Sequence, residues 1–125
     1  MTFMNKELNK NFTLDDLKIV LKDCICSTRN DKSTYVIYNE PIIILDGNFY
    51  IEFKFYDKKL IEFNLQSVDY DYEQAHIYHC SWLEDNCKKE NFIREDNNKY
   101  KNNDIELYAD RSLKGGNPQI LCKVL

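Results

Sequence analysis

Hydrophobic spacing predicts a helix near the N-terminus. From residue 14, apolar side chains recur every three or four positions, at Leu14, Leu17, Leu21, Cys24 and Ile25. Thr13 precedes this stripe as an N-cap and Asp16 follows three residues later, as in a capping box with Asp in place of Glu. Phe12 and Leu17 occupy the positions of a hydrophobic staple. We expect a helix over residues 14–26.

From residue 33 to residue 66 the period changes to two, which predicts antiparallel strands joined by short turns. The expected strands cover residues 34–38, 42–45, 49–56 and 60–66, with a hairpin turn at 46–48. Matching the apolar faces of the last two strands places Phe53 opposite Phe63 and Phe55 opposite Ile61. This register leaves residues 57–59 as a three-residue loop and sets Lys54 opposite Glu62.

The other face of these strands mixes aromatic and charged residues. It carries Tyr50, Glu52, Lys54 and Tyr56, and we expect Ile42 and Ile44 on the same side. Such a face suits either a second packed layer or a protein interface. The helix expected next along the chain is the candidate for that layer.

A second helix is predicted for residues 71–87, although residues 77–82 also alternate as a strand would. Asp71 and Gln74 are spaced as a cap pair. The expected inward residues are Ala75, His79, Trp82 and Leu83. The nearly all-polar residues 88–103 predict an irregular surface connection, and strands follow at 105–109 and 119–125. The predicted fold class is α+β, with a mostly antiparallel sheet of about five or six strands, an N-terminal helix, and a second helix before a C-terminal hairpin.

Length and composition limit the classes of protein. The 125 residues suit a single domain over 1–125, with residues 1–11 expected to be frayed. The net charge is −4, which argues against nucleic-acid binding and allows a basic protein partner. The five cysteines are an odd number and no signal peptide is recognisable, so we expect reduced thiols in the cytoplasm. The longest apolar run, residues 42–45, is too short to span a membrane.

One cluster carries residues that could support chemistry, and it contains both histidines of the chain. His76 and Cys80 are spaced to share a zinc ion on a helix, and Glu73 with His76 resembles half of a di-iron motif. Neither motif has its other half, so we expect no metal or cofactor. A cysteine nucleophile at Cys80 would need a histidine and an orienting group in good geometry, which one helix does not provide. We therefore expect one packed and one exposed histidine, inert thiols, and no enzymatic activity.

Two stretches carry a resemblance to a known family. Residues 46–65 form a hairpin with a Phe-x-x-x-Lys-Leu turn, and residues 79–120 begin at His79 with Trp82 and Leu83 and end beyond Asp110 in a glycine-containing turn and an aliphatic strand. Over residues 42–125 this arrangement resembles small bacterial immunity proteins, which neutralise polymorphic or contact-dependent toxins. The chain departs from the pattern by ending on Val124 and Leu125 rather than an aromatic residue, and by its polar insert at 90–103.

The resemblance implies a non-enzymatic, stoichiometric inhibitor that binds a toxin domain in the cytoplasm. Because toxic nucleases tend to be basic, an acidic surface with aromatic anchors is the expected contact. The predicted partner-binding residues are Asp69, Tyr70, Asp71, Tyr72 and Glu73. Simple capping of a surface helix is the alternative explanation for these residues. The alternative functions are a self-associating (for example homodimeric) structural module of a phage or mobile element and, third, a small enzyme of unknown class.

Overall fold

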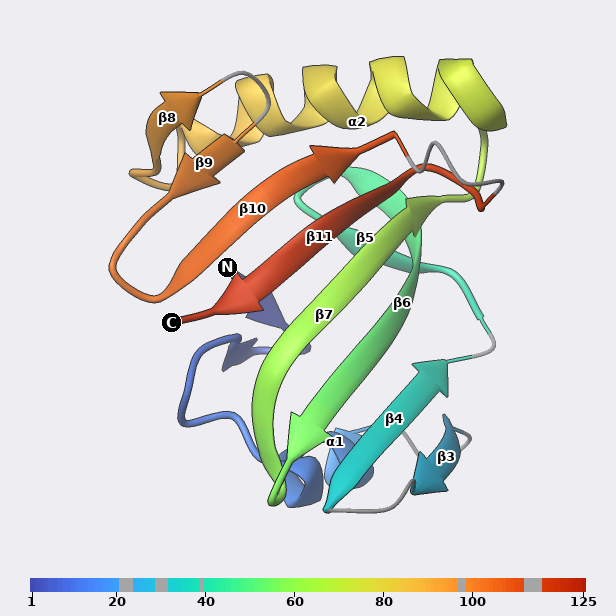
Figure 1. Ribbon diagram of the computed structural model, residues 1–125, viewed down its shortest axis with the longest axis vertical. Helices are drawn as coiled ribbons and strands as arrows, with labels where there is room; N and C mark the ends of the chain where they lie inside the picture. Colours follow the sequence, from blue (N-terminus) through green and yellow to red (C-terminus); the bar gives the residue numbers. More distant parts are fainter. Residues whose placement is uncertain (21–23, 29–31, 39, 97–98, 112–115) are drawn as a thin grey trace.

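The chain folds around one large, twisted antiparallel sheet (Figure 1). A computed structural model describes residues 1–20, 24–28, 32–38, 40–96, 99–111 and 116–125. Within these residues the sheet has nine strands in the order β3-β4-β6-β7-β11-β10-β9-β8, and β5 pairs with β6 beside this path. The strands are β3 (Cys24–Thr28), β4 (Ser33–Tyr38), β5 (Ile42–Ile44), β6 (Gly47–Tyr56), β7 (Lys59–Ser67), β8 (Ile93–Asp96), β9 (Lys99–Lys101), β10 (Ile105–Asp110) and β11 (Gln119–Val124).

The described residues also form two helices, α1 (Leu14–Val20) and α2 (Tyr72–Cys87), and a small hairpin of β1 (Thr2–Phe3) and β2 (Lys6–Glu7). The α+β class and the mostly antiparallel sheet are therefore confirmed. The sheet is larger than the expected five or six strands, because three of its strands come from segments that were predicted to be helix or loop.

The N-terminal residues are the first of these differences. Residues 1–11 were expected to be frayed, but β1 and β2 pair with each other, and Met1, Phe3 and Leu8 are buried. The Phe3 ring meets the Phe53 ring edge-on, with centroids 5.3 Å apart. Three apolar side chains among polar neighbours are enough to hold this short hairpin against the sheet.

The start of α1 confirms the predicted capping box. The Thr13 amide donates to Asp16 Oδ2 at 3.0 Å, and the Asp16 amide donates to Thr13 Oγ1 at 3.2 Å. The hydrogen bond from the Thr13 amide, assisted by Lys6, lowers the pKa of the Asp16 carboxyl. Phe12 and Leu17 are both buried, as a hydrophobic staple requires.

The end of the first helix was predicted wrongly. α1 ends at Val20, and Cys24–Thr28 is strand β3, which pairs with β4. Leu21 lies outside the described residues. Only Cys24 and Ile25 of the apolar stripe fall in this segment, too few positions to establish a helical period, and pairing with β4 satisfies the backbone through a partner distant from the helix.

The β6–β7 hairpin has the expected register at its centre and a shift at its turn. Phe53 lies opposite Phe63, and Lys54 lies opposite Glu62, as predicted. The register then shifts, so Leu60 rather than Ile61 lies opposite Phe55. The loop is consequently two residues, Asp57 and Lys58, both with positive φ (49° and 65°). This geometry is that of a type I′ turn, whose twist matches paired strands better than a three-residue loop does.

The second helix was predicted closely. α2 runs from Tyr72 to Cys87, and the four expected inward residues Ala75, His79, Trp82 and Leu83 are all buried. The predicted Asp71–Gln74 cap pair is wrong, since the Asp71 side chain makes no cap hydrogen bond. The Gln74 amide donates instead to the Asp71 backbone carbonyl at 3.1 Å, which removes the donor that the carboxylate would have bound.

Residues 88–103 are not simply an irregular connection, because they contain β8 and β9. β9 joins β10, and its central residue Tyr100 is buried, whereas Lys99 and Lys101 on either side are only partly buried. Only alternate residues of such a strand face the core, so a single tyrosine is sufficient to anchor it. Every residue of β8 is exposed, and Tyr100 is the one buried residue of β9, so the polar composition of these two strands reflects their exposure to solvent.

The core lies on one face of the sheet. Side chains of alternate residues on β6, β7, β10 and β11 point to this face and are almost completely buried, including Phe49, Phe53, Phe63, Leu107 and Ile120. In Figure 1 the N-terminal hairpin, α1 and β5 lie behind the central strands, and the ring contacts of Phe53 place the hairpin on this face. α2 also packs here, because Trp82 meets the Phe49 ring at 5.0 Å.

Candidate functional site

The opposite face of the sheet remains accessible. We call it the open face. It is formed by alternate residues of seven strands, whose side chains point away from the core. They are Tyr35, Ile37, Tyr50, Glu52, Lys54, Tyr56, Glu62, Asn64, Gln66, Asp96, Lys99, Lys101, Glu106, Tyr108, Gln119, Leu121 and Lys123. The large side chains Ile37, Tyr50, Tyr56 and Tyr108 on it are 42–49% exposed. Of the two explanations for this mixed face, a layer formed by α2 is wrong, since α2 packs against Phe49 on the other side.

Ile42 and Ile44 were expected on the open face and lie instead on the core face. Both are buried, and Ile43 between them is 78% exposed. β5 pairs with the first residues of β6, so Ile42 lies opposite the buried Phe49. The register of this short hairpin, set by the two-residue turn at Leu45 and Asp46, decides which isoleucines face the core.

Charges alternate in a row across the open face. The strand register places Lys54 beside Glu62, Glu62 beside Lys123, Lys123 beside Glu106, and Glu106 beside Lys101. Three ion pairs involve residues of this row: Lys54 with Glu62 at 3.8 Å, Glu106 with Lys99 at 3.3 Å, and Lys101 with Glu95 at 3.7 Å. Opposite charges on neighbouring strands support the sheet while keeping this face close to neutral.

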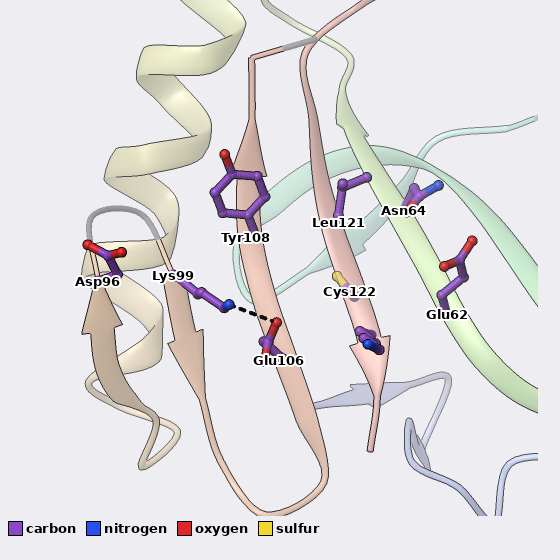
Figure 2. Close-up of a pocket in the computed structure, with 9 residues that line it drawn as sticks. Glu62, Asn64, Asp96, Lys99, Glu106, Tyr108, Leu121 and Cys122 are labelled. Carbon is purple, nitrogen blue, oxygen red and sulfur yellow. Dashed lines mark ion pairs between the residues drawn. The ribbon is translucent and has the colours of Figure 1, made fainter.

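A concavity of about 460 Å³ opens next to this row (Figure 2). Leu121 and Tyr108, which lie opposite each other on β11 and β10, give it apolar surface. Its rim is charged and polar, and consists of Glu62, Asn64, Asp96, Lys99, Glu106 and Lys123. A second, smaller hollow of about 130 Å³ shares Asn64 and extends toward Tyr50 and Ile37. The two hollows together cross the open face from β8 to β4.

The five residues predicted to bind a partner lie together at the start of α2, and all are exposed. Figure 1 shows this region at the corner where β7 and β10 end and β11 begins. Tyr72 is 72% exposed and Tyr70 is 43% exposed, and the Tyr70 ring stacks on Tyr78 with centroids 4.7 Å apart. The structure thus brings the predicted residues onto one surface, which we call the α2 patch.

The α2 patch is acidic, unlike the open face. Glu73 pairs with Arg111 at 3.3 Å, whereas neither Asp69 nor Asp71 forms an ion pair with any described residue. Sequence reasoning missed Ile77, which is 65% exposed one turn further along the helix, and Tyr78, which supports Tyr70. Ile77 and Tyr78 follow Gln74 by three and four residues, which places them on the same side of a helix, and this spacing could have identified them from the sequence.

The histidine and cysteine cluster is more buried than expected. Both His76 and His79 are buried, so the expectation of one exposed histidine is wrong. His76 Nε2 lies 3.6 Å from Cys80 Sγ, but its Nδ1 has no hydrogen-bond partner among the described residues. Burial raises the pKa of the Cys80 thiol, which therefore stays protonated at neutral pH. A thiol without an oriented base is a poor nucleophile.

His79 has a structural contact instead. Its Nε2 accepts a hydrogen bond from the Ser67 amide at 3.1 Å, linking α2 to the end of β7. Burial, together with the nearby His76, lowers the pKa of His79 to about 4. Across the described ranges, no three His, Cys, Asp or Glu side chains lie together as a metal site requires.

No family model matches this chain, and the comparisons with curated proteins and with solved structures found no match either. Neither of the two described helices is both long and apolar enough to cross a membrane.

Proposed function

We propose that this protein is a non-enzymatic inhibitor that acts by binding another protein, of the kind represented by bacterial immunity proteins. The observation that supports this proposal is the open face. Its strands pack a complete core on one side, and on the other they present tyrosines, Leu121 and a broad concavity that no described element covers. Accessible aromatic residues on a rigid sheet are typical anchors of protein interfaces.

The charge distribution suits a basic partner. On the open face, the positive charges of the lysines balance the negative charges of the carboxylates. In the α2 patch, by contrast, Asp69 and Asp71 form no ion pair with a described residue. The acidic patch would accelerate encounter with a basic toxin domain, and the neutral, partly apolar face would provide the contact area.

Copurification with the product of the neighbouring gene tests the class of function. A toxin that binds one-to-one and loses its activity would support the proposal. No binding to any toxin encoded beside this gene, or a stable homodimer formed through the open face, would contradict it. The second result would favour the self-associating structural module.

Variants then test the surface. We expect Leu121→Arg to weaken toxin binding at least about tenfold, because it places a charge in the centre of the concavity. Ile19→Arg is the matched control, since Ile19 is 71% exposed on α1, which lies on the other side of the sheet. Equal effects of the two variants would rule out the open face as the contact surface.

A further inference from the structure

A separate concave site lies beside the start of α2, away from the two hollows of the open face. This cleft of about 430 Å³ is lined by Tyr70, Gln74, Ile77, Tyr78 and Ser81. The last four residues follow one another at helical spacing along one side of α2, and Tyr70 lies over them from the segment that precedes the helix. The cleft is thus built on a regular helix rather than on a loop.

The aromatic pair in the cleft is firmly supported. Tyr78 contacts Tyr70 with centroids 4.7 Å apart and an angle of 26° between the rings, and contacts the buried Phe49 with centroids 6.2 Å apart. Tyr78 therefore links the cleft to the core, while Tyr70, at 43% exposed, presents its ring to solvent. A ring held in place in this way loses little conformational entropy when a ligand stacks on it.

The electrostatic surroundings favour a cation. Asp69 is exposed and directly precedes Tyr70 in the chain. Burial raises the pKa of Tyr78, and the neighbouring Tyr70 and the negative charge of Asp69 raise it further. At the edge of the same patch, Arg111 already binds Glu73 at 3.3 Å. Asp69 and Asp71 have no such partner among the described residues. A phosphate-bearing ligand would be repelled by these carboxylates, and a purely apolar ligand would leave them unused.

We propose that this cleft binds an arginine side chain of a partner protein, with the guanidinium stacked on Tyr70 and its charge balanced by Asp69. A planar, weakly hydrated guanidinium stacks on an aromatic ring in an apolar cleft better than a compact, strongly hydrated ammonium does. If the proposed inhibitory function is correct, this arginine belongs to the basic toxin. The inference that arginine binds here depends on the cleft and its surroundings, and not on which protein carries the arginine.

The test is a titration of the whole protein, labelled with ¹³C on its tyrosine rings, with three short capped peptides. Each peptide has one central residue: arginine, lysine or citrulline, the uncharged analogue of arginine. We expect saturable shifts of the Tyr70 and Tyr78 ring signals with the arginine peptide, binding at least about threefold weaker with lysine, and none with citrulline. Equal binding of citrulline and arginine, or the absence of saturable shifts, would overturn the proposal.

Two variants and a control locate the effect. Tyr70→Leu removes the ring but keeps apolar volume, and Asp69→Asn removes the charge, so each should weaken arginine binding about threefold or more. Ile19→Ala alters an apolar side chain that is 71% exposed on α1, outside both the cleft and the open face, and should change nothing. Arginine binding that survives both cleft variants would overturn the site. If the arginine peptide binds but no toxin partner is found, the proposal for the cleft stands and only the proposed inhibitory function is contradicted.

Discussion

The two faces of the same strands differ in how deeply their side chains are buried, and β6 shows the difference most clearly. Phe49, Phe53 and Phe55 are fully buried, whereas Tyr50 and Tyr56, which alternate with them, are 42% and 49% exposed. Both sets are aromatic, so hydrophobic content alone does not distinguish them. The core face stabilises the fold, and the open face is available for binding. Variants on each face test how complete this division is.

The largest expected difference is between Phe53 and Tyr50. Phe53 contacts the rings of Phe3, Phe12, Phe55 and Phe63. Phe53→Ala should therefore lower the free energy of unfolding by about 3–5 kcal/mol, because it leaves a cavity at the centre of the core. Tyr50→Ala should cost about 1 kcal/mol or less. Chemical denaturation measures both, and similar losses would show that the open face also stabilises the fold.

His79, which is buried on the core face, should make the stability of the folded protein depend on pH. Its pKa is about 4 in the folded protein against 6.5 as the ordinary value, so below pH 6.5 the unfolded chain binds more protons. Stability should consequently fall as the pH decreases from 6.5 to about 4, by on the order of 3 kcal/mol.

The matched variant for this prediction is His79→Gln, whose side-chain oxygen can still accept the Ser67 amide. Denaturation curves at several pH values should show a shallower dependence for this variant between pH 6.5 and about 4. Parallel curves for the two proteins would mean that carboxyl groups, rather than His79, cause the loss.

Gly47 tests how tightly the core face is packed. A Cβ atom there would clash with the Phe49 ring and lie 2.6 Å from Trp82 Nε1, and Trp82 Nε1 also donates to the Leu45 carbonyl. Gly47→Ala should cost roughly 1–3 kcal/mol, since neither ring can move without disturbing buried neighbours. Asn48→Ala, at the next and only partly buried position, is the control for thermal unfolding. A neutral Gly47→Ala would show that this corner is loosely packed.

The smallest expected effect concerns the charge row of the open face. Lys54 and Glu62 are 3.8 Å apart, and their side chains are 30% and 44% exposed. A double-mutant cycle with Lys54→Ala and Glu62→Ala should give a coupling of about 0.2–1 kcal/mol that decreases at high salt. A coupling well above this range would mean that the row contributes to stability like a core element.

Local signals in the chain were sufficient for several features. The capping box of Thr13 and Asp16 forms as predicted because both partners lie within one helical turn. The opposition of Phe53 and Phe63 follows from matching two apolar faces, since a slip of one residue would bury Glu62. The clustering of residues 69–73 on one exposed surface also follows from their position at a helix start.

Other features depend on partners that are distant in sequence. The local spacing of Cys24 and Ile25 is compatible with a helix, but their pairing with β4 makes this segment a strand. The register of β6 and β7 shifts by one residue near their turn because a two-residue turn suits the twist of the strands. Likewise, β9 is a strand because β10 lies beside it and Tyr100 reaches the core.

The sequence by itself determined the alternation of side chains along each strand, because that pattern is a property of the extended backbone. Only the tertiary structure decided which face α2 covers. The contact between Trp82 and Phe49 makes that choice, and it leaves Tyr50, Tyr108 and Leu121 accessible on the open face. Hydrophobic burial is non-directional, so a pattern can identify two faces, but only the packing of elements against each other shows which one is covered.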